Sequence, residues 1–279
     1  MKKYQTKTTI YFLFVLWLVL AFLFESSDLL LSDYLFNPRS TWAKFFEQYG
    51  EIPGLIVSLT GVYIYFTSNK LSSNSKKLIA YFFLMLISTA GLIYLNFLFT
   101  YQALGVNYNS QSKIVLLVIG SSIINFGLLF YVKSKIQFTY QQYFFSRVVL
   151  RMIIFGYLLT NLPLKFLWGR IRFRDFHGDF SNFSAWYIPN GFNGNDSFPS
   201  GHSAMAWILI SLFILFTDKS LLTRTAGKTI LISYALIVSY SRIVIGAHFA
   251  SDVLFGSMFM ILTYVISKHF LYEEQMNKK

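Results

Sequence analysis

The sequence predicts an all-α polytopic membrane protein, forming a single domain over residues 1–279 with about eight transmembrane helices. Its 279 residues are 55% hydrophobic and 20% aromatic, and only 13% are charged. Soluble domains are about one quarter charged, so this composition excludes an ordinary soluble enzyme. Apolar runs near the length of about 20 residues that crosses a bilayer recur along the chain.

The apolar runs define the expected spans. The first covers residues 9–24, and we expect it to be retained because no small-residue cleavage site follows it. The others are expected near residues 52–67, 78–99, 113–132, 148–164, 203–217, 229–245 and 250–267. Between the first two spans, residues 29–49 mix aromatic and charged side chains, which predicts one or two interfacial helices on the membrane surface.

The basic residues indicate how the spans are oriented. A formal net charge of +12 would suit nucleic-acid binding, but in so apolar a chain Lys and Arg mark cytoplasmic membrane edges. We therefore expect the lipid bilayer and no nucleic acid as partner, with both termini in the cytoplasm. This orientation leaves five basic residues between positions 165 and 242 on the outer face, which the positive-inside rule disfavours. They are Lys165, Arg170, Arg172, Arg174 and Arg242.

Three polar clusters are predicted to meet at this outer face. They are residues 165–174 at the end of the fifth span, residues 198–202 at the start of the sixth, and residues 241–252 between the last two. Lys165, Arg172 and Arg242 would form a cationic pocket suited to a dianionic phosphate. Ser200 and Gly201 directly precede a predicted helix, whose N-terminus also favours an anion.

Two histidines in these clusters suggest catalysis. His248 and Asp252 are four residues apart and share a helical face, where the carboxylate can hold the imidazole in one tautomer. His202 supplies a second imidazole, so one histidine can act as nucleophile and the other as general acid. The residues alone do not decide which one attacks. The competing interpretation is structural, with Arg170, Arg172 and Arg174 acting as snorkelling lipid anchors.

The three clusters resemble the three-part signature of the type 2 phosphatidic acid phosphatase superfamily. That signature reads Lys-x6-Arg-Pro, then Pro-Ser-Gly-His, then Ser-Arg-x5-His-x3-Asp, and residues 165–252 match it at every position but one. Phe173 stands where the family has proline, which leaves the path of the chain after Arg172 open. The resemblance implies a six-helix core, to which this chain adds a hairpin, and metal-independent hydrolysis of a phosphate ester through a phosphohistidine, without a cofactor.

The resemblance also assigns roles to the matched positions. His248 is the expected nucleophile, Asp252 its orienting partner, and His202 the acid that protonates the leaving alcohol. The groups expected to hold the phosphoryl oxygens are Lys165, Arg172, Arg242, Ser200 and the amide of Gly201.

The substrate is expected to be an anionic membrane lipid. The Gly-Arg-Ile-Arg run and the aromatic, Asn-rich loop 173–198, expected to cover the site, are similar to bacterial inner-membrane members that dephosphorylate lipid A. A phosphate monoester of lipid A at the periplasmic face of the inner membrane is therefore the expected substrate.

Several alternatives stay open. The similarity extends weakly to phosphatases of undecaprenyl diphosphate and phosphatidylglycerophosphate, and a second lipid in place of water would make the protein a phosphotransferase. An anion transporter is disfavoured because the clusters lie at span ends and no repeat is visible. A metal site at Asp175, His177 and Asp179 is disfavoured because they alternate tightly on one loop. The oligomeric state is not indicated.

Overall fold

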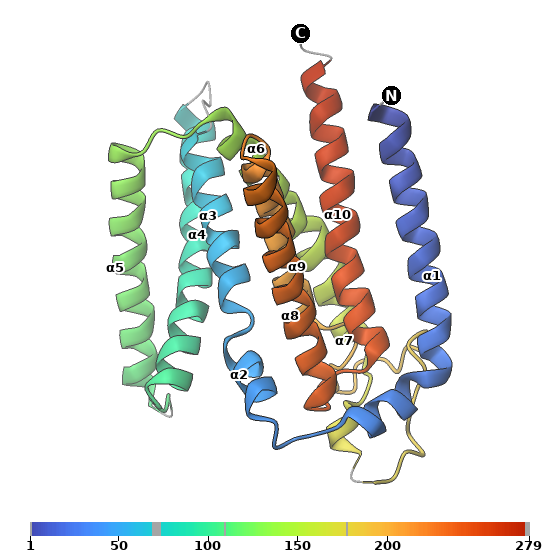
Figure 1. Cartoon of the computed structure of the whole chain (residues 1–279). Coiled ribbons are helices and arrows are strands. Elements are labelled where there is room, and N and C mark those ends of the chain that lie inside the picture. Colours follow the sequence, from blue (N-terminus) through green and yellow to red (C-terminus); the bar gives the residue numbers. More distant parts are fainter. Residues whose placement is uncertain (1, 69–73, 109, 177, 277–279) are drawn as a thin grey trace. The chain divides into compact units, whose positions relative to one another are not determined.

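The computed structural model describes residues 2–68, 74–108, 110–176 and 178–276, and every regular element in these ranges is a helix (Figure 1). This confirms the all-α fold class. Within the described ranges, six helices are long and apolar enough to cross a membrane, and each corresponds to a predicted span. They are Lys7–Leu35, Lys77–Tyr101, Gln111–Lys135, Tyr140–Asp175, Leu221–Val244 and Ala250–Glu274.

The other two predicted spans form shorter helices. Helix α3 (Ile52–Ser68) has 17 residues, which at the α-helical rise is about 25 Å. The second, Gly201–Phe216, combines the α-helix α8 (Gly201–Trp207) with a 3₁₀ segment, Ile208–Phe216. Because an α-helix rises about 1.5 Å per residue and a 3₁₀ helix about 2 Å, the whole of Gly201–Phe216 extends about 28 Å, close to the thickness of a hydrocarbon core.

The N-terminal region differs from its predicted division. Helix α1 (Lys2–Leu35) continues well past the predicted end of the first span, so residues 29–35 belong to it and form no separate interfacial helix. Helix α2 (Thr41–Tyr49) follows as a separate element. It begins where the Ser40 side chain accepts a hydrogen bond from the Ala43 amide, which satisfies a free N–H of the first turn.

The chain divides into two compact units, of which the first comprises Met1–Glu51 and Arg151–Lys279. In this unit α1 runs antiparallel to and alongside α10 (Ala250–Met276), and α9 (Leu221–Val244) lies next to α8 (Figure 1). The N-terminal end of α1 and the C-terminal end of α10 lie at one end of the unit. The loop that follows α7 (Leu162–Trp168) lies at the other.

Small residues allow the helices of the first unit to approach closely. A Cβ on Gly256 of α10 would lie 2.3 Å from the Ser200 carbonyl oxygen, and one on Gly156 would lie 2.7 Å from the Met260 sulfur. Ala206 and Ala235 form a buried contact between α8 and α9. Gly256 therefore sets the start of α8 directly against α10, as close packing at small residues does in membrane helices.

The continuous helical segment 140–168, which leads to the first predicted cluster, is irregular before Pro163. Helix α6 (Tyr140–Arg151) passes into a π-helical segment, Met152–Asn161, and then into α7, which contains Pro163. Proline lacks an amide hydrogen and clashes with the preceding turn, which accounts for a wider winding there. This helical segment ends at Gly169, whose φ of 53° is a left-handed conformation typical of helix ends.

The second unit comprises Ile52–Leu150 and contains the extra hairpin, formed by α4 (Asn74–Leu98) and α5 (Gln111–Lys135). Buried polar side chains join its helices. Asn125 of α5 donates to Thr89 of α4 at 2.7 Å and accepts a hydrogen bond from Tyr63 of α3. Such bonds link helices where no water is available.

Candidate active site

A tight turn after α9 brings His248 back to Arg242. Gly246 has a φ of 66°, and a Cβ there would lie 2.7 Å from the Phe36 ring, so both conformation and space require glycine. The turn lets the amides of Ala247 and His248 donate to the Arg242 carbonyl oxygen at 3.0 and 3.2 Å. This geometry explains the spacing of Arg242 and His248 in the third cluster.

The His248 ring is held in one orientation by a backbone carbonyl. Its Nδ1 lies 2.6 Å from the carbonyl oxygen of Ser197, and the side chain is only 3% exposed. Because a carbonyl oxygen can only accept, Nδ1 carries the proton and Nε2 keeps its lone pair. The ring is therefore fixed in the tautomer that leaves Nε2 able to attack.

The surroundings of His248 also keep it neutral. Its pKa is lowered from 6.5 to about 3, chiefly by burial and in part by the nearby charges of Lys165 and Arg242, while Asp252 acts in the opposite direction. These contributions place Lys165 of the first predicted cluster and Arg242 and Asp252 of the third within electrostatic reach of one imidazole. A neutral imidazole is the form that can act as a nucleophile.

Asp252 is fully buried and fixed on every side. Its Oδ2 accepts hydrogen bonds from the Ser197 hydroxyl at 2.6 Å and the Phe249 amide at 2.9 Å, and its Oδ1 accepts one from Arg170 at 2.6 Å. Oδ2 lies 3.8 Å from His248 Nδ1, which is an ion-pair distance but longer than a hydrogen bond. Asp252 thus acts on the imidazole by charge and through Ser197, while the Ser197 carbonyl makes the direct contact.

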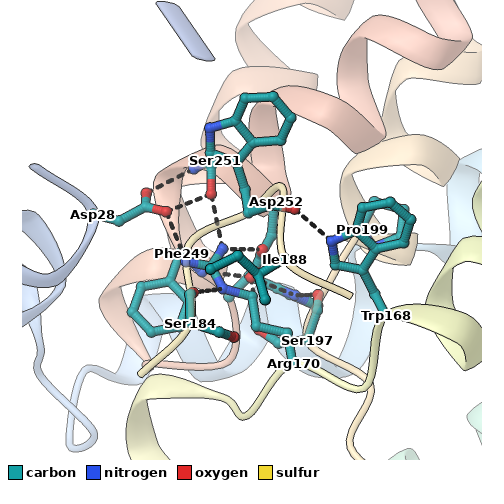
Figure 2. Close-up of polar contacts among 12 residues, drawn as sticks. Asp28, Trp168, Arg170, Ser184, Ile188, Ser197, Pro199, Phe249, Ser251 and Asp252 are labelled. Carbon is teal, nitrogen blue, oxygen red and sulfur yellow. Dashed lines mark hydrogen bonds and ion pairs between the residues drawn. The ribbon is translucent and has the colours of Figure 1, made fainter. Parts of the chain in front are cut away.

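Arg170 lies at the centre of this buried network (Figure 2). It is 1% exposed and forms ion pairs with Asp252 at 2.6 Å and with Asp28 of α1 at 2.9 Å. Its guanidinium also lies 4.2 Å from the centre of the Phe249 ring, a cation–π contact. The interpretation of Arg170 as a snorkelling lipid anchor is therefore wrong.

Two of the three predicted phosphate-binding cations share a carboxylate. Arg172 lies 2.5 Å and Lys165 3.7 Å from Asp196. Lys165 also donates to the backbone carbonyls of Asp196 and Pro199, which ties the first cluster to the second. Asp196 thus occupies a position that an anionic substrate group could take.

Arg242, the third cation, has unused donors. Its Nη2 lies 3.4 Å from Glu47 of α2, but in the described part of the chain its buried Nε and Nη1 have no hydrogen-bond partner, and neither does Arg172 Nε. Burial alone raises the pKa of Glu47, but the bond from Arg174 and the charges of Arg242, Arg174 and His202 outweigh it and lower that pKa. Glu47 is therefore ionised, and the two arginines still offer free N–H groups.

His202 is held by α2 and by Glu51, two residues beyond the end of that helix. Its Nδ1 lies 2.9 Å from the carboxylate of Glu51, and its Nε2 lies 3.0 Å from the backbone carbonyl oxygen of Glu47. Both neighbours of the ring are hydrogen-bond acceptors. These two contacts fix the orientation of the His202 ring at the start of α8.

Ser200 and Gly201 form the start of α8, as predicted. The Ser200 hydroxyl accepts a hydrogen bond from the Ser203 amide at 3.3 Å and caps the helix. Its own amide donates to the Asp252 carbonyl oxygen at 3.0 Å, which joins the second cluster to the third. The Ser200 side chain therefore serves as a helix cap in this structure.

The long loop 173–198 packs largely inward. Phe173, Phe176 and Phe198 are 6%, 7% and 1% exposed, so these three side chains lie in the protein interior. Trp186 donates to the Ala21 carbonyl of α1 at 2.9 Å, whereas Tyr187 is exposed. Phe173 and Phe176 pack in one buried cluster with Phe249, and Phe198 packs in another with Ala21 and Phe255, so aromatic density here indicates a core.

Phe173, which stands where the family signature has proline, lies at the start of a turn. It begins a 3₁₀ turn, Phe173–Asp175, and packs edge-on against Phe36 with ring centres 5.2 Å apart. The first position of a helical turn needs no intrahelical amide donor, which is why proline is compatible there. In this chain, aromatic packing holds Phe173 at the start of that turn.

The remaining loop hypothesis, a metal site at 175–179, includes His177, which lies outside the described residues. Elsewhere in the described ranges, no three His, Cys, Asp or Glu side chains converge as metal ligands would.

Sequence reasoning missed several residues of this site. They contribute carboxylates or a hydroxyl to the site. Asp28 lies on α1, Glu47 on α2, Glu51 just beyond α2, and Asp196 and Ser197 on the loop before α8. An acidic residue inside an apolar helix was the available signal for Asp28, because such a charge needs a partner. Nothing in the sequence indicated which cation it pairs with.

Comparisons with known proteins agree with the motif. Residues 145–276 match the PAP2 superfamily. Two relatives are named lipid A 1-phosphatase. One, from Rhizobium johnstonii, is 34% identical over 119 residues, covering 41% of this chain and 44% of the relative. The other, from Rhizobium etli, is 32% identical over 146 residues, covering 50% and 58%. The chain thus spans about half the length of these relatives, and no solved structure matches it significantly.

The neutral, buried state of His248 makes stability depend on pH. In the unfolded chain this histidine binds a proton below pH 6.5, whereas in the folded protein it does so only near pH 3. Its contribution to stability is therefore complete above pH 6.5 and is lost as the pH falls from 6.5 toward 3. We expect the unfolding midpoint of the wild type in detergent to fall more steeply over this window than that of His248→Gln. Parallel curves would show that His248 is not held neutral by the fold.

Proposed function

Because residues 145–276 match the PAP2 superfamily, we propose that this chain is a phosphatase that removes a phosphate monoester from the headgroup of a membrane lipid. The observation that carries the proposal is the set of buried, unpartnered donors on Arg172 and Arg242. Buried N–H groups without a partner are costly, and an anion with several acceptor oxygens would satisfy them. Lys165 would add a third positive charge to the same group.

In the first step, Nε2 of His248 attacks phosphorus and the bond from phosphorus to the ester oxygen breaks. Nδ1 keeps its proton, which it donates to the Ser197 carbonyl oxygen. The new bond from Nε2 to phosphorus therefore leaves a cationic imidazole beside the carboxylate of Asp252. His202 transfers a proton to the leaving oxygen, which departs as a neutral alcohol. The cations stabilise charge on the phosphoryl oxygens, as preorganised donors do in phosphoryl transfer.

In the second step, a water molecule attacks the phosphoryl group on His248. His202, now neutral, takes a proton from this water, the N–P bond breaks, and inorganic phosphate leaves with both histidines in their starting states. Glu51 keeps His202 oriented through both steps. A lipid hydroxyl in place of water would give the phosphotransferase variant of the same chemistry.

The substrate we propose is lipid A, at its 1-phosphate. Both relatives carry lipid A 1-phosphatase as their name, and the chain is rich in apolar helices that would keep the acyl chains of a substrate in the bilayer. The exposed part of loop 173–198, including Tyr187 and Phe192, supplies aromatic faces of the kind that pack against a sugar. Undecaprenyl diphosphate and phosphatidylglycerophosphate also carry phosphate, but they lack the sugar headgroup of lipid A.

The proposed location is the periplasmic face of a bacterial inner membrane, with both termini in the cytoplasm. The two ends of the first unit support this orientation, since α1 begins and α10 ends opposite the loop that carries Arg172 and Asp196 (Figure 1). The proposed reaction uses only side chains of this chain and needs no metal ion.

The general-acid role of His202 predicts a dependence on the leaving group. His202→Ala should lower turnover of an alkyl phosphate far more than that of p-nitrophenyl phosphate, because p-nitrophenol leaves without protonation. Glu51→Gln should shift the ratio in the same direction by less, since it weakens only the contact at 2.9 Å to Nδ1. The ratio of kcat values for the two substrates measures the effect. Equal losses on both would contradict the acid role.

Lipid A itself provides the test of the proposed function. Wild type and His248→Ala would be expressed in a bacterium whose lipid A retains its 1-phosphate, and the purified proteins would be assayed in EDTA. We expect the wild type to remove one phosphate, about 80 Da, from the 1-position, and the variant to remove none. His248→Ala must be recovered from the membrane at the wild-type level for the comparison to hold.

Three outcomes would contradict parts of the proposal. Unchanged lipid A alongside hydrolysed undecaprenyl diphosphate or phosphatidylglycerophosphate would move the substrate to that lipid. Activity that appears only with added Mg²⁺ or Zn²⁺ would overturn metal independence. Full activity of His248→Ala would overturn the nucleophile.

A further inference from the structure

We propose that Asp28, on the N-terminal helix α1 and outside the stretch that matches the family, is a positioning residue for His248, acting through Arg170 and Asp252. This inference rests on the proposed function. It assigns α1 a part in the reaction beyond crossing the membrane. The contacts in Figure 2 carry the argument.

Asp28 is 1% exposed and holds the first turn of α10. Its Oδ1 accepts a hydrogen bond from the Ser251 amide at 2.9 Å, and its Oδ2 accepts from the Ser251 hydroxyl and from Arg170. Because donors reach both oxygens, the side chain is a carboxylate. It therefore fixes the residue that directly precedes Asp252.

Arg170 transmits this contact to Asp252. Its Nη2 donates to Asp28, while its Nη1 donates to the Ser251 hydroxyl at 2.8 Å and to Asp252 Oδ1 at 2.6 Å. Its Nε donates to the Ser184 carbonyl oxygen at 3.0 Å, so the guanidinium cannot rotate without breaking several bonds. The position of Asp252 beside His248 thus depends on an arginine that Asp28 holds from the other side.

The network also sets the charge beside the nucleophile. Two carboxylates share one guanidinium, which leaves a net charge of one negative in a region closed to water. When His248 bonds to phosphorus its ring becomes cationic, and this negative charge stabilises it. Without the charge of Asp28, Arg170 would be neutralised by Asp252 alone, and Asp252 would stabilise the cationic ring less.

The consequence concerns the chemical step and not phosphate binding. Within the described part of the chain, Asp28 forms its hydrogen bonds and ion pair with Arg170 and Ser251 and with none of Lys165, Arg172 and Arg242. Losing Asp28 should therefore slow formation of the phosphohistidine and leave the cationic pocket intact. In metal sites, loss of a partner one residue removed from the ligand costs about 10- to 100-fold, and we expect a similar loss in kcat.

The experiment compares Asp28→Asn with the matched control Asp33→Asn, an exposed carboxylate on the same helix. Each purified protein would be assayed with a soluble phosphate monoester for kcat and KM, and with inorganic phosphate for its inhibition constant. Asp28→Asn should lower kcat about tenfold or more. Its KM and its phosphate inhibition constant should stay at the values of the wild type, and Asp33→Asn should match the wild type throughout.

The outcomes separate this inference from the proposed function. If the wild type had no activity on any phosphate ester, the proposed function itself would be contradicted. An active wild type together with a folded Asp28→Asn of unchanged kcat would overturn the positioning role. So would an Asp28→Asn whose KM and phosphate inhibition constant rise with the loss, because Asp28 would then act on binding.

A milder variant decides the case in which Asp28→Asn does not fold. Ser251→Ala removes one hydroxyl that joins Asp28 to Arg170, keeps the amide bond to Asp28, and leaves every charge in place. It should lower kcat in the same direction by less, again at constant KM. A folded Ser251→Ala with the wild-type kcat would overturn the inference.

Discussion

The hydrogen bond from Nδ1 of His248 to the carbonyl oxygen of Ser197 is the contact on which the site depends. At 2.6 Å it fixes the tautomer and leaves Nε2 as the only ring nitrogen with a lone pair. The bond joins two segments 51 residues apart, the loop before α8 and the turn after α9. Gly246 and Gly256 make this meeting possible, one by a left-handed turn and the other by direct backbone contact.

A buried network of charge supports that bond. Asp28, Arg170 and Asp252 are each at most 1% exposed, and together they join α1, the end of α7 and the start of α10. Breaking one member of such a network leaves an uncompensated charge, which is far more costly than losing a surface ion pair. The two carboxylates and the arginine therefore constrain the fold and the reactivity of His248 together.

Motifs and hydropathy predicted the fold class, the spans and the residues of the three clusters, because spacing along a helix and the length of apolar runs are local properties. They did not predict the continuation of α1 to Leu35, because polar residues 25–28 interrupt the apolar run there. They also did not predict the 3₁₀ winding after α8, whose residues are as apolar as those of an α-helical span. Pairings such as Arg170 with Asp28 or His202 with Glu51 join residues more than 140 positions apart, and one sequence holds no signal for them. For the same reason, the aromatic loop resembled a surface segment although three of its phenylalanines are buried.

The most direct test of this account is the position of the covalent phosphate. Purified wild type would be mixed with a phosphate monoester, quenched in alkali within the first turnover, digested and analysed by mass spectrometry. The account predicts an acid-labile phosphoramidate on Nε2 of His248, because Nδ1 is occupied by the Ser197 carbonyl. Phosphate on Nδ1, on His202, or in an acid-stable ester with Ser200 would contradict it.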